Sequence, residues 1–180
     1  MKENSIHKFH IFLPWEDEKQ EQWLAGMSRK GLHLKEPGPL GRFLFSQGTG
    51  KEYSYRLDYN RNKPAEEYLQ ILRDAGWEYL GTMAGWHYWR KEIKAGQSAE
   101  LFTDQESKVQ KYQRMLTFYG TSTPGAAVLF IAFAAVFKQY PGRHPLWVVI
   151  LLLGTCLGIL LFAGISVLMI QLRINKIKQS

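Results

Sequence analysis

The chain has 180 residues, a length typical of one domain with a short addition, and its one cysteine, Cys156, excludes an internal disulfide and a cysteine-based zinc site. Its net charge of +7 would suit a nucleic-acid partner, but all sixteen acidic residues lie before residue 107. The basic excess therefore sits beside the apolar C-terminal segments, which favours a membrane boundary over a nucleic-acid surface.

The N-terminal part, residues 1–95, has mixed charge and predicts a cytosolic α+β domain. Its first half, 7–47, begins with an apolar strand over 9–13. A helix over 16–30 follows, with acidic residues in its first turn, and Gly31 ends it. Two short strands over 32–35 and 42–46 then form a hairpin across a Pro-Gly-Pro turn.

The second half, 52–92, repeats this order at an offset of about 45 residues, so we predict an internal duplication. A strand over 52–59 precedes a helix over 64–75, which ends at Gly76. A second hairpin then joins strands over 77–80 and 86–91. The β-α-β-β halves predict a ferredoxin-like antiparallel sheet, with both helices packed on one face and the other face partly open.

Aromatic residues gather on the strands of the second half. Two interpretations stay open at this point. The aromatic side chains form an exposed face for a ligand or partner, or they pack in the core and across strands. No RNP-like sequence accompanies them, so RNA is not the expected ligand. The residues are Tyr53, Tyr55, Trp77, Tyr79, Trp86, Tyr88 and Trp89.

The sequence offers no pattern typical of catalysis or of a cofactor. It contains no phosphate-binding loop, Gly-rich dinucleotide turn or nucleophile elbow. The histidines lack metal-ligand spacing, and the acids near residues 16–18 and 66–67 suit helix N-termini better than a carboxylate pair. We therefore expect no enzyme activity, no catalytic residues, no metal and no cofactor.

The C-terminal part predicts two membrane-spanning helices. Residues 96–117 are expected to form a linker and an amphipathic helix at the membrane surface. The first span, 118–139, has two alternative starts: Thr123 caps a helix that begins at Pro124, or a longer helix runs from near Met115 and kinks at Pro124. We favour a break or kink at Pro124. The second span covers 146–172, and a basic tail covers 173–180.

The short connection between the spans predicts a helical hairpin with both termini on one side. Six basic residues flank that side, whereas the connection carries two, Lys138 and Arg143. The positive-inside rule then predicts a multi-pass protein of the cell membrane with both termini in the cytosol. Gly154 and Gly158 form a G-x-x-x-G pattern for close packing, against small residues of the first span or another helix. The six flanking residues are Lys108, Lys111, Arg114, Arg173, Lys176 and Lys178.

Three ordered segments resemble a family of small bacterial membrane proteins that is known as a domain of unknown function. The resemblance covers about residues 7–92 and departs at Leu32, where Gly-Trp is the common pair. It implies a single such domain followed by membrane helices, encoded beside PadR-like regulators, and it assigns no catalytic residue. The segments are Trp23-Leu24-x-x-Met27-x-x-x-Gly31, Tyr53-x-Tyr55-Arg56-x-Asp58-Tyr59 and Ala75-Gly76-Trp77-Glu78-Tyr79 with Trp86-x-Tyr88.

These observations lead to one main hypothesis and two rivals. The main one is a non-enzymatic, membrane-anchored sensing or docking protein that couples a membrane or ligand signal to a cytosolic partner, such as a transcriptional regulator. The first rival is an accessory subunit of a transporter or membrane enzyme that binds through its helical hairpin. The second is an enzyme whose aromatic face binds a small molecule. The expected partners are the lipid bilayer and a protein or a second copy, with no nucleic acid.

Overall fold

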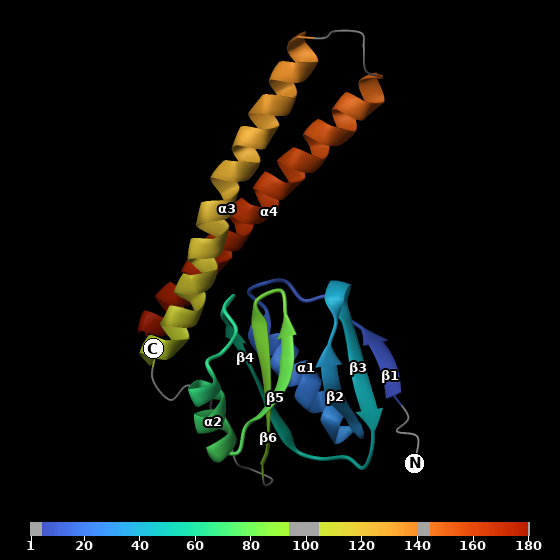
Figure 1. Ribbon diagram of the computed structural model, residues 1–180, viewed down its shortest axis with the longest axis vertical. Helices are drawn as coiled ribbons and strands as arrows, with labels where there is room; N and C mark the ends of the chain where they lie inside the picture. The colour runs from blue at the N-terminus through green and yellow to red at the C-terminus, as the bar shows by residue number, and fades with distance from the viewer. Residues whose placement is uncertain (1–4, 94–104, 140–144, 180) are drawn as a thin grey trace. The chain divides into compact units, whose positions relative to one another are not determined.

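A computed structural model describes residues 5–93, 105–139 and 145–179 (Figure 1). The linker expected over 96–104 and most of the connection between the spans lie outside the described residues. The chain divides into two compact units, Met1–Lys111 and Tyr112–Ser180. The first unit holds the α+β domain and the start of a long helix. The second holds the rest of that helix and a further long helix.

The first unit repeats one order of elements, strand, helix, strand, strand. Five of the six predicted strands and both predicted helices are present to within a few residues. The first strand is wrong: it covers 5–9, not 9–13, because β3 has no residue beyond Arg42 with which the later segment could pair. The elements are β1 Ser5–Phe9, α1 Asp17–Arg29, β2 Leu32–Pro37, β3 Arg42–Gln47, β4 Tyr53–Tyr59, α2 Glu66–Asp74, β5 Glu78–Met83 and β6 Trp86–Glu92.

The six strands form two separate antiparallel sheets, in the orders β1-β3-β2 and β4-β6-β5. The prediction of one sheet is therefore wrong, although β2 and β5 lie in contact. Both of these edge strands contain a bulge, between Leu34 and Glu36 in β2 and between Tyr79 and Gly81 in β5. A bulge disrupts the ladder and bends the strand, and Pro37 has no N–H to donate. These features explain why β2 and β5 remain unpaired neighbours.

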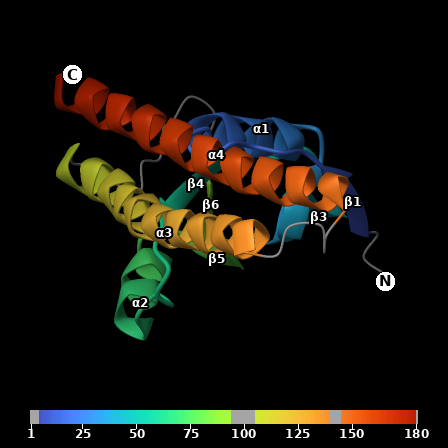
Figure 2. The ribbon, with the colours of Figure 1, turned by 90° about the horizontal axis from the view of Figure 1, so that it is seen from above.

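The helices lie on opposite sides of the β4-β6-β5 sheet, so the expectation of both on one face is also wrong (Figure 2). On one side, Tyr88 accepts a hydrogen bond from Gln20 of α1 at 2.8 Å. On the other, the adjacent Trp89 packs in a cluster with Leu69 and Leu72 of α2. Consecutive strand residues point to opposite faces, which places the two helices apart.

Helix α1 packs against both sheets, since it contacts β2 as well as β4. Towards the first sheet it presents Trp23, whose ring centroid lies 5.2 Å from that of Phe43 and 5.7 Å from that of Phe45. Towards the second sheet it presents polar side chains. This division of α1 into an aromatic and a polar face positions the site described below.

The two long helices are α3, Gln105–Gln139, and α4, Leu146–Gln179, and each is long and apolar enough to cross a membrane. Helix α3 runs from Gln105 through Pro124, so the favoured break at Pro124 is absent and the helix begins ten residues before the longer of the two predicted starts. Hydroxyl groups of the preceding turns donate to backbone carbonyls, Thr121 to Thr117 at 2.8 Å and Thr123 to Tyr119 at 2.6 Å. Such bonds are common for Ser and Thr inside helices.

Candidate functional site

The predicted aromatic face is not a single surface. Tyr55, Trp86 and Tyr88 point towards α1, whereas Tyr79 and Trp89 point towards α2. Trp77 packs with the α2 cluster, and Tyr53 is half-buried at the end of β4. Five of the seven side chains are buried: Tyr55, Trp77, Trp86, Tyr88 and Trp89. The burial favours the packing interpretation of these residues.

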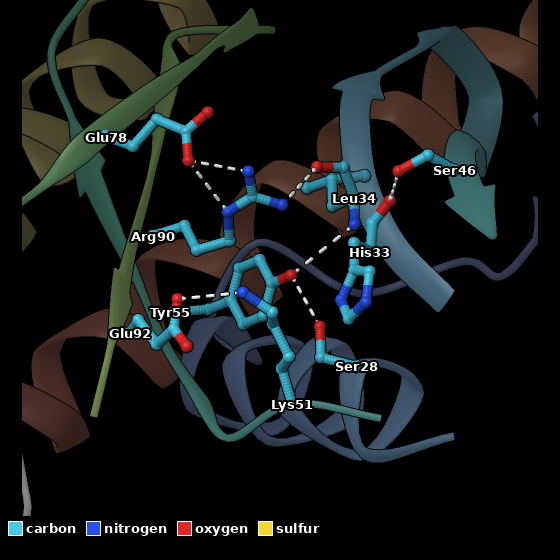
Figure 3. Close-up of polar contacts among 9 residues, drawn as sticks. All are labelled: Ser28, His33, Leu34, Ser46, Lys51, Tyr55, Glu78, Arg90 and Glu92. Atoms are coloured by element: carbon cyan, nitrogen blue, oxygen red, sulfur yellow. Dashed lines mark hydrogen bonds and ion pairs between the residues drawn. The ribbon is translucent and has the colours of Figure 1, made fainter. Parts of the chain in front are cut away.

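One group of polar contacts joins the two sheets at Leu34, on the free edge of β2 (Figure 3). The Leu34 N–H donates to the Tyr55 hydroxyl at 3.4 Å, and that hydroxyl shares a 2.7 Å hydrogen bond with Ser28. The Leu34 carbonyl accepts from Arg90 at 3.1 Å. Side chains of the second half thus satisfy backbone groups that a neighbouring strand would otherwise pair.

The same group extends towards the surface through ion pairs. Arg90 donates to one carboxylate oxygen of Glu78 from Nε at 3.0 Å and from Nη2 at 2.6 Å. Lys51 and Glu92, with half-exposed side chains, form a 3.1 Å pair beside it. Exposed ion pairs of this kind contribute little to the free energy of unfolding. We assign this group a structural role, the joining of the two sheets, because Tyr55 and Arg90 bond to the backbone of Leu34.

A second polar group, the Lys111 cluster, consists of Asp17, Glu21, Arg56 and Lys111. Lys111, near the start of α3 and within the first unit, donates to Asp17 at 2.7 Å and to the Leu57 carbonyl at 3.3 Å. Glu21 accepts from the Leu57 N–H at 2.8 Å and from Arg56 at 3.2 Å. Both backbone groups of Leu57, on the free edge of β4, are therefore bonded to buried charged side chains.

Burial makes Glu21 sensitive to protons near neutral pH. Removal from water raises the pKa of its carboxyl group from 4.5 to about 7. Lys111, Arg56 and the Leu57 hydrogen bond oppose the shift, while the neighbouring Asp17 adds to it. With both carboxylates ionised the four charges cancel, and a proton on Glu21 leaves a net positive charge. The Lys111 cluster can thus hold the start of α3 against α1 and take up a proton.

The sequence interpretation missed this cluster. It treats Asp17 as an acid that favours a helix N-terminus and Lys111 as a cation that flanks the membrane. The sequence did contain one signal, the spacing that places Asp17, Glu21, Leu24 and Ser28 on one helical face. The structure shows that all four side chains are buried. Of the other predicted flanking residues, Lys176 and Lys178 are exposed, and the rest are half-buried: Lys108, Arg114 and Arg173.

The glycine pattern of α4 has open space around it. No heavy atom of the described residues lies within 4 Å of the position that a Cβ on Gly154 or Gly158 would take. The close packing expected against α3 is therefore not formed within the part of the chain that the structure describes.

Metal ligation finds no support among the described residues, which contain no group of three or more His, Cys, Asp or Glu side chains placed to hold an ion. The polar groups at Leu34 and Leu57 combine cations with carboxylates at hydrogen-bond distance. Such pairing uses the carboxylate oxygens internally. These bonds have a structural role, since they join elements of the fold.

A family model described as a protein of unknown function (DUF2812) matches residues 16–123. The matched region contains all four residues of the Lys111 cluster and ends one residue before Pro124. Searches of curated proteins and of solved structures gave no match. The family model therefore joins the α+β domain to the first part of α3 in one unit of sequence, and leaves α4 outside it.

Proposed function

Because the chain belongs to the DUF2812 family of proteins of unknown function, we propose a role from its geometry, that of a non-enzymatic, membrane-anchored sensing or docking protein. Its α+β domain lies in the cytosol, and α3 and α4 cross the cell membrane with both termini in the cytosol. It couples a membrane or ligand signal to a cytosolic partner. A transcriptional regulator is the partner that the family resemblance suggests.

The membrane part of the proposal is supported by the apolar side chains of α3 and α4. Among the described residues between Val128 and Leu172, sixteen large apolar side chains are exposed, far more than a soluble surface normally tolerates. No Asp or Glu occurs after Glu106, and basic residues stand near the ends of the apolar segments. A lipid bilayer would cover this surface.

The coupling part depends on one observation, the buried ion pair between Lys111 and Asp17. Lys111 belongs to the same uninterrupted helix as the first span. A tilt or rotation of that helix would therefore move an ammonium group bonded to α1 and to β4. A rotation of α3 at Lys111 would strain or break this pair.

The two halves of the domain are proposed to be a duplication of one split β-α-β unit, the unit of ferredoxin-like folds. Three features support this. The strand order is the same in both halves, first strand, third strand, second strand. The bulges of β2 and β5 lie at positions that differ by 45 residues. Gly31 and Gly76, which follow the two helices, both have a left-handed backbone with φ of 78° and 82°.

A change of bilayer thickness tests the coupling. We expect the amide hydrogen exchange of α1 and β4 to differ between nanodiscs of short-chain and long-chain phosphatidylcholine, because hydrophobic mismatch tilts a spanning helix. The double variant Asp17→Asn/Lys111→Met, which has lost the charges, should show a smaller difference. Lys176→Met is the matched control and should behave as the wild type. Identical exchange of the wild type in both lipids would refute the coupling.

A second candidate function, an accessory subunit of a transporter or membrane enzyme, is favoured by the open surface at Gly154 and Gly158. Replacement of both glycines by Leu would abolish close helix approach without disturbing a contact of the described chain. If the accessory role holds, the variant should lose its membrane complex on native gels. An unchanged complex would leave the sensing role as the better explanation.

A further inference from the structure

A second feature, distinct from the Lys111 cluster, is a surface with four large apolar side chains that are exposed to solvent. We call Phe9, Ile11, Leu13 and Leu40 the Leu40 patch. Their exposed fractions are 65%, 67%, 40% and 84%. They stand out in the α+β domain, where the one other exposed large apolar side chain among the described residues is Ile71.

The backbone brings these residues together. The His10 N–H donates to the Gly41 carbonyl at 2.8 Å, which holds the segment after β1 beside the turn that contains Leu40. Ile11 Cγ1 lies 3.2 Å from the position that a Cβ on Gly41 would take. Phe9 is paired with Arg42, directly after the same turn. The Leu40 patch therefore belongs to one corner of the first sheet.

The outward direction of the patch follows from the contacts of its neighbours. His10 and Phe12 lie against Trp23, with ring centroids 5.2 Å and 5.6 Å from that of Trp23. Phe12 is half-buried and His10 remains exposed. Ile11, between them, makes neither ring contact and is 67% exposed.

Leu40 also has a backbone conformation that a leucine rarely adopts, with φ of 55° and ψ of 36°. This left-handed conformation strains a residue with a branched side chain, and Gly, Asn or Asp would adopt it with less strain. Because Leu40 is 84% exposed, the fold buries too little of its apolar side chain to offset this backbone strain. An external apolar environment would account for it.

One cation stands beside the patch on the same face. Arg42 lies opposite Phe9 in the strand pairing, is exposed, and has no ion pair among the residues that the structure describes. Glu16, three residues after Leu13, is bonded to the Leu13 N–H and to Lys19. Exposed apolar side chains beside a basic residue suit an anionic lipid surface.

We propose that the Leu40 patch inserts into the interface of an anionic membrane, with Arg42 against the headgroups. The proposal rests on the membrane anchorage proposed above, because that anchorage keeps a bilayer beside the domain at all times. Insertion would hold the domain at the membrane surface in an orientation fixed by β1 and by the turn before β3.

The test uses the full chain with Cys156→Ser and a single new cysteine, Leu40→Cys, labelled with an environment-sensitive fluorophore. The labelled chain is placed in nanodiscs of phosphatidylcholine and phosphatidylglycerol that contain a lipid with a quencher in the upper part of its acyl chain. The matched control is Ile71→Cys, at a 59% exposed apolar position of α2. We expect quenching at residue 40 to exceed that at residue 71 by at least about twofold.

The charge contribution is tested with Arg42→Gln in the same labelled chain. Quenching at residue 40 should fall in this variant and in discs of pure phosphatidylcholine. Unchanged quenching in both would overturn the assignment of Arg42 to anionic headgroups.

Three other outcomes would overturn the insertion. The first is equal quenching at both positions, and the second is no quenching at residue 40 in a chain that stays in the disc. The third is a disulfide between the introduced cysteines of two unlabelled Leu40→Cys copies, which would assign the patch to self-association. A chain that fails to enter discs would instead contradict the anchorage itself. The two failures are therefore distinguishable.

Discussion

Replacement of Lys111 by Met is expected to destabilise the N-terminal unit by about 3–5 kcal/mol, because it leaves a buried carboxylate without its partner. The Asp17 side chain is fully buried and that of Lys111 is 9% exposed, so water cannot replace the lost ammonium group. The Leu57 carbonyl would lose a hydrogen bond as well. Denaturant unfolding of the full chain in detergent, followed by the fluorescence of the domain tryptophans, measures the change.

Two further variants make this prediction specific. Lys176→Met removes an exposed cation of the other unit and should change the free energy of unfolding by less than about 0.5 kcal/mol. Asp17→Asn/Lys111→Met removes both charges and should recover much of the loss, since an unpaired buried charge is the main cost. If Lys111→Met alone matched the wild type, the ion pair would have no role in holding the start of α3 to the domain.

The N-terminal unit is expected to lose stability as the pH rises from 5 to 8. Burial raises the pKa of Glu21 from 4.5 to about 7, so the folded state binds a proton that the unfolded state has already released. A group with a raised pKa contributes its full stability below its unfolded pKa, and that stability is lost as the pH passes the folded pKa. Between pH 5 and 8 the loss from Glu21 is on the order of 2–3 kcal/mol.

Glu21→Gln isolates this contribution. The amide keeps an oxygen for the Leu57 N–H but cannot ionise. We expect the variant and the wild type to have similar unfolding free energies at pH 5, and the variant to be the more stable at pH 8. Parallel pH profiles for the two proteins would show that Glu21 does not titrate in this range.

The two predictions concern the same cluster and so bear on the proposed coupling. A proton on Glu21 weakens its pairing with Arg56 without removing the bond between Asp17 and Lys111. The start of α3 should therefore stay bonded to α1 through Lys111 and Asp17 across neutral pH, while the nearby pair between Arg56 and Glu21 weakens or strengthens. Proton binding at Glu21 and the position of α3 would then influence each other.

Local patterns in the sequence predicted most of the elements correctly. Alternation along 53–59 and the glycines at positions 31 and 76 placed β4 and the ends of both helices to within about one residue. The apolar runs predicted two long apolar helices and the start of α4 at Leu146, because such a prediction depends on composition over some twenty residues. They did not predict the start of α3, which begins at Gln105 and not at residue 118. These features depend on residues that are near one another in the chain.

The division into two sheets could not be predicted in this way. Whether β2 pairs with β5 depends on two bulges and on Arg90 and Tyr55, which bond to the edge of β2 from the other half of the domain. The aromatic cluster was ambiguous for a related reason. Alternation shows that Tyr88 and Trp89 face opposite ways, but it does not show that a helix covers each side.

The repeated order of elements, the acid-free C-terminal part and the two helices of membrane length could all be predicted, since each follows from residue type and spacing along the chain. The roles of the buried charged residues could be recognised only in the folded chain. Asp17 and Lys111 are separated by 94 residues, and each alone resembles an ordinary surface charge. Their pairing in a buried site depends on α1, β4 and the start of α3 meeting at Leu57, because burial and partner distance are properties of the folded chain alone.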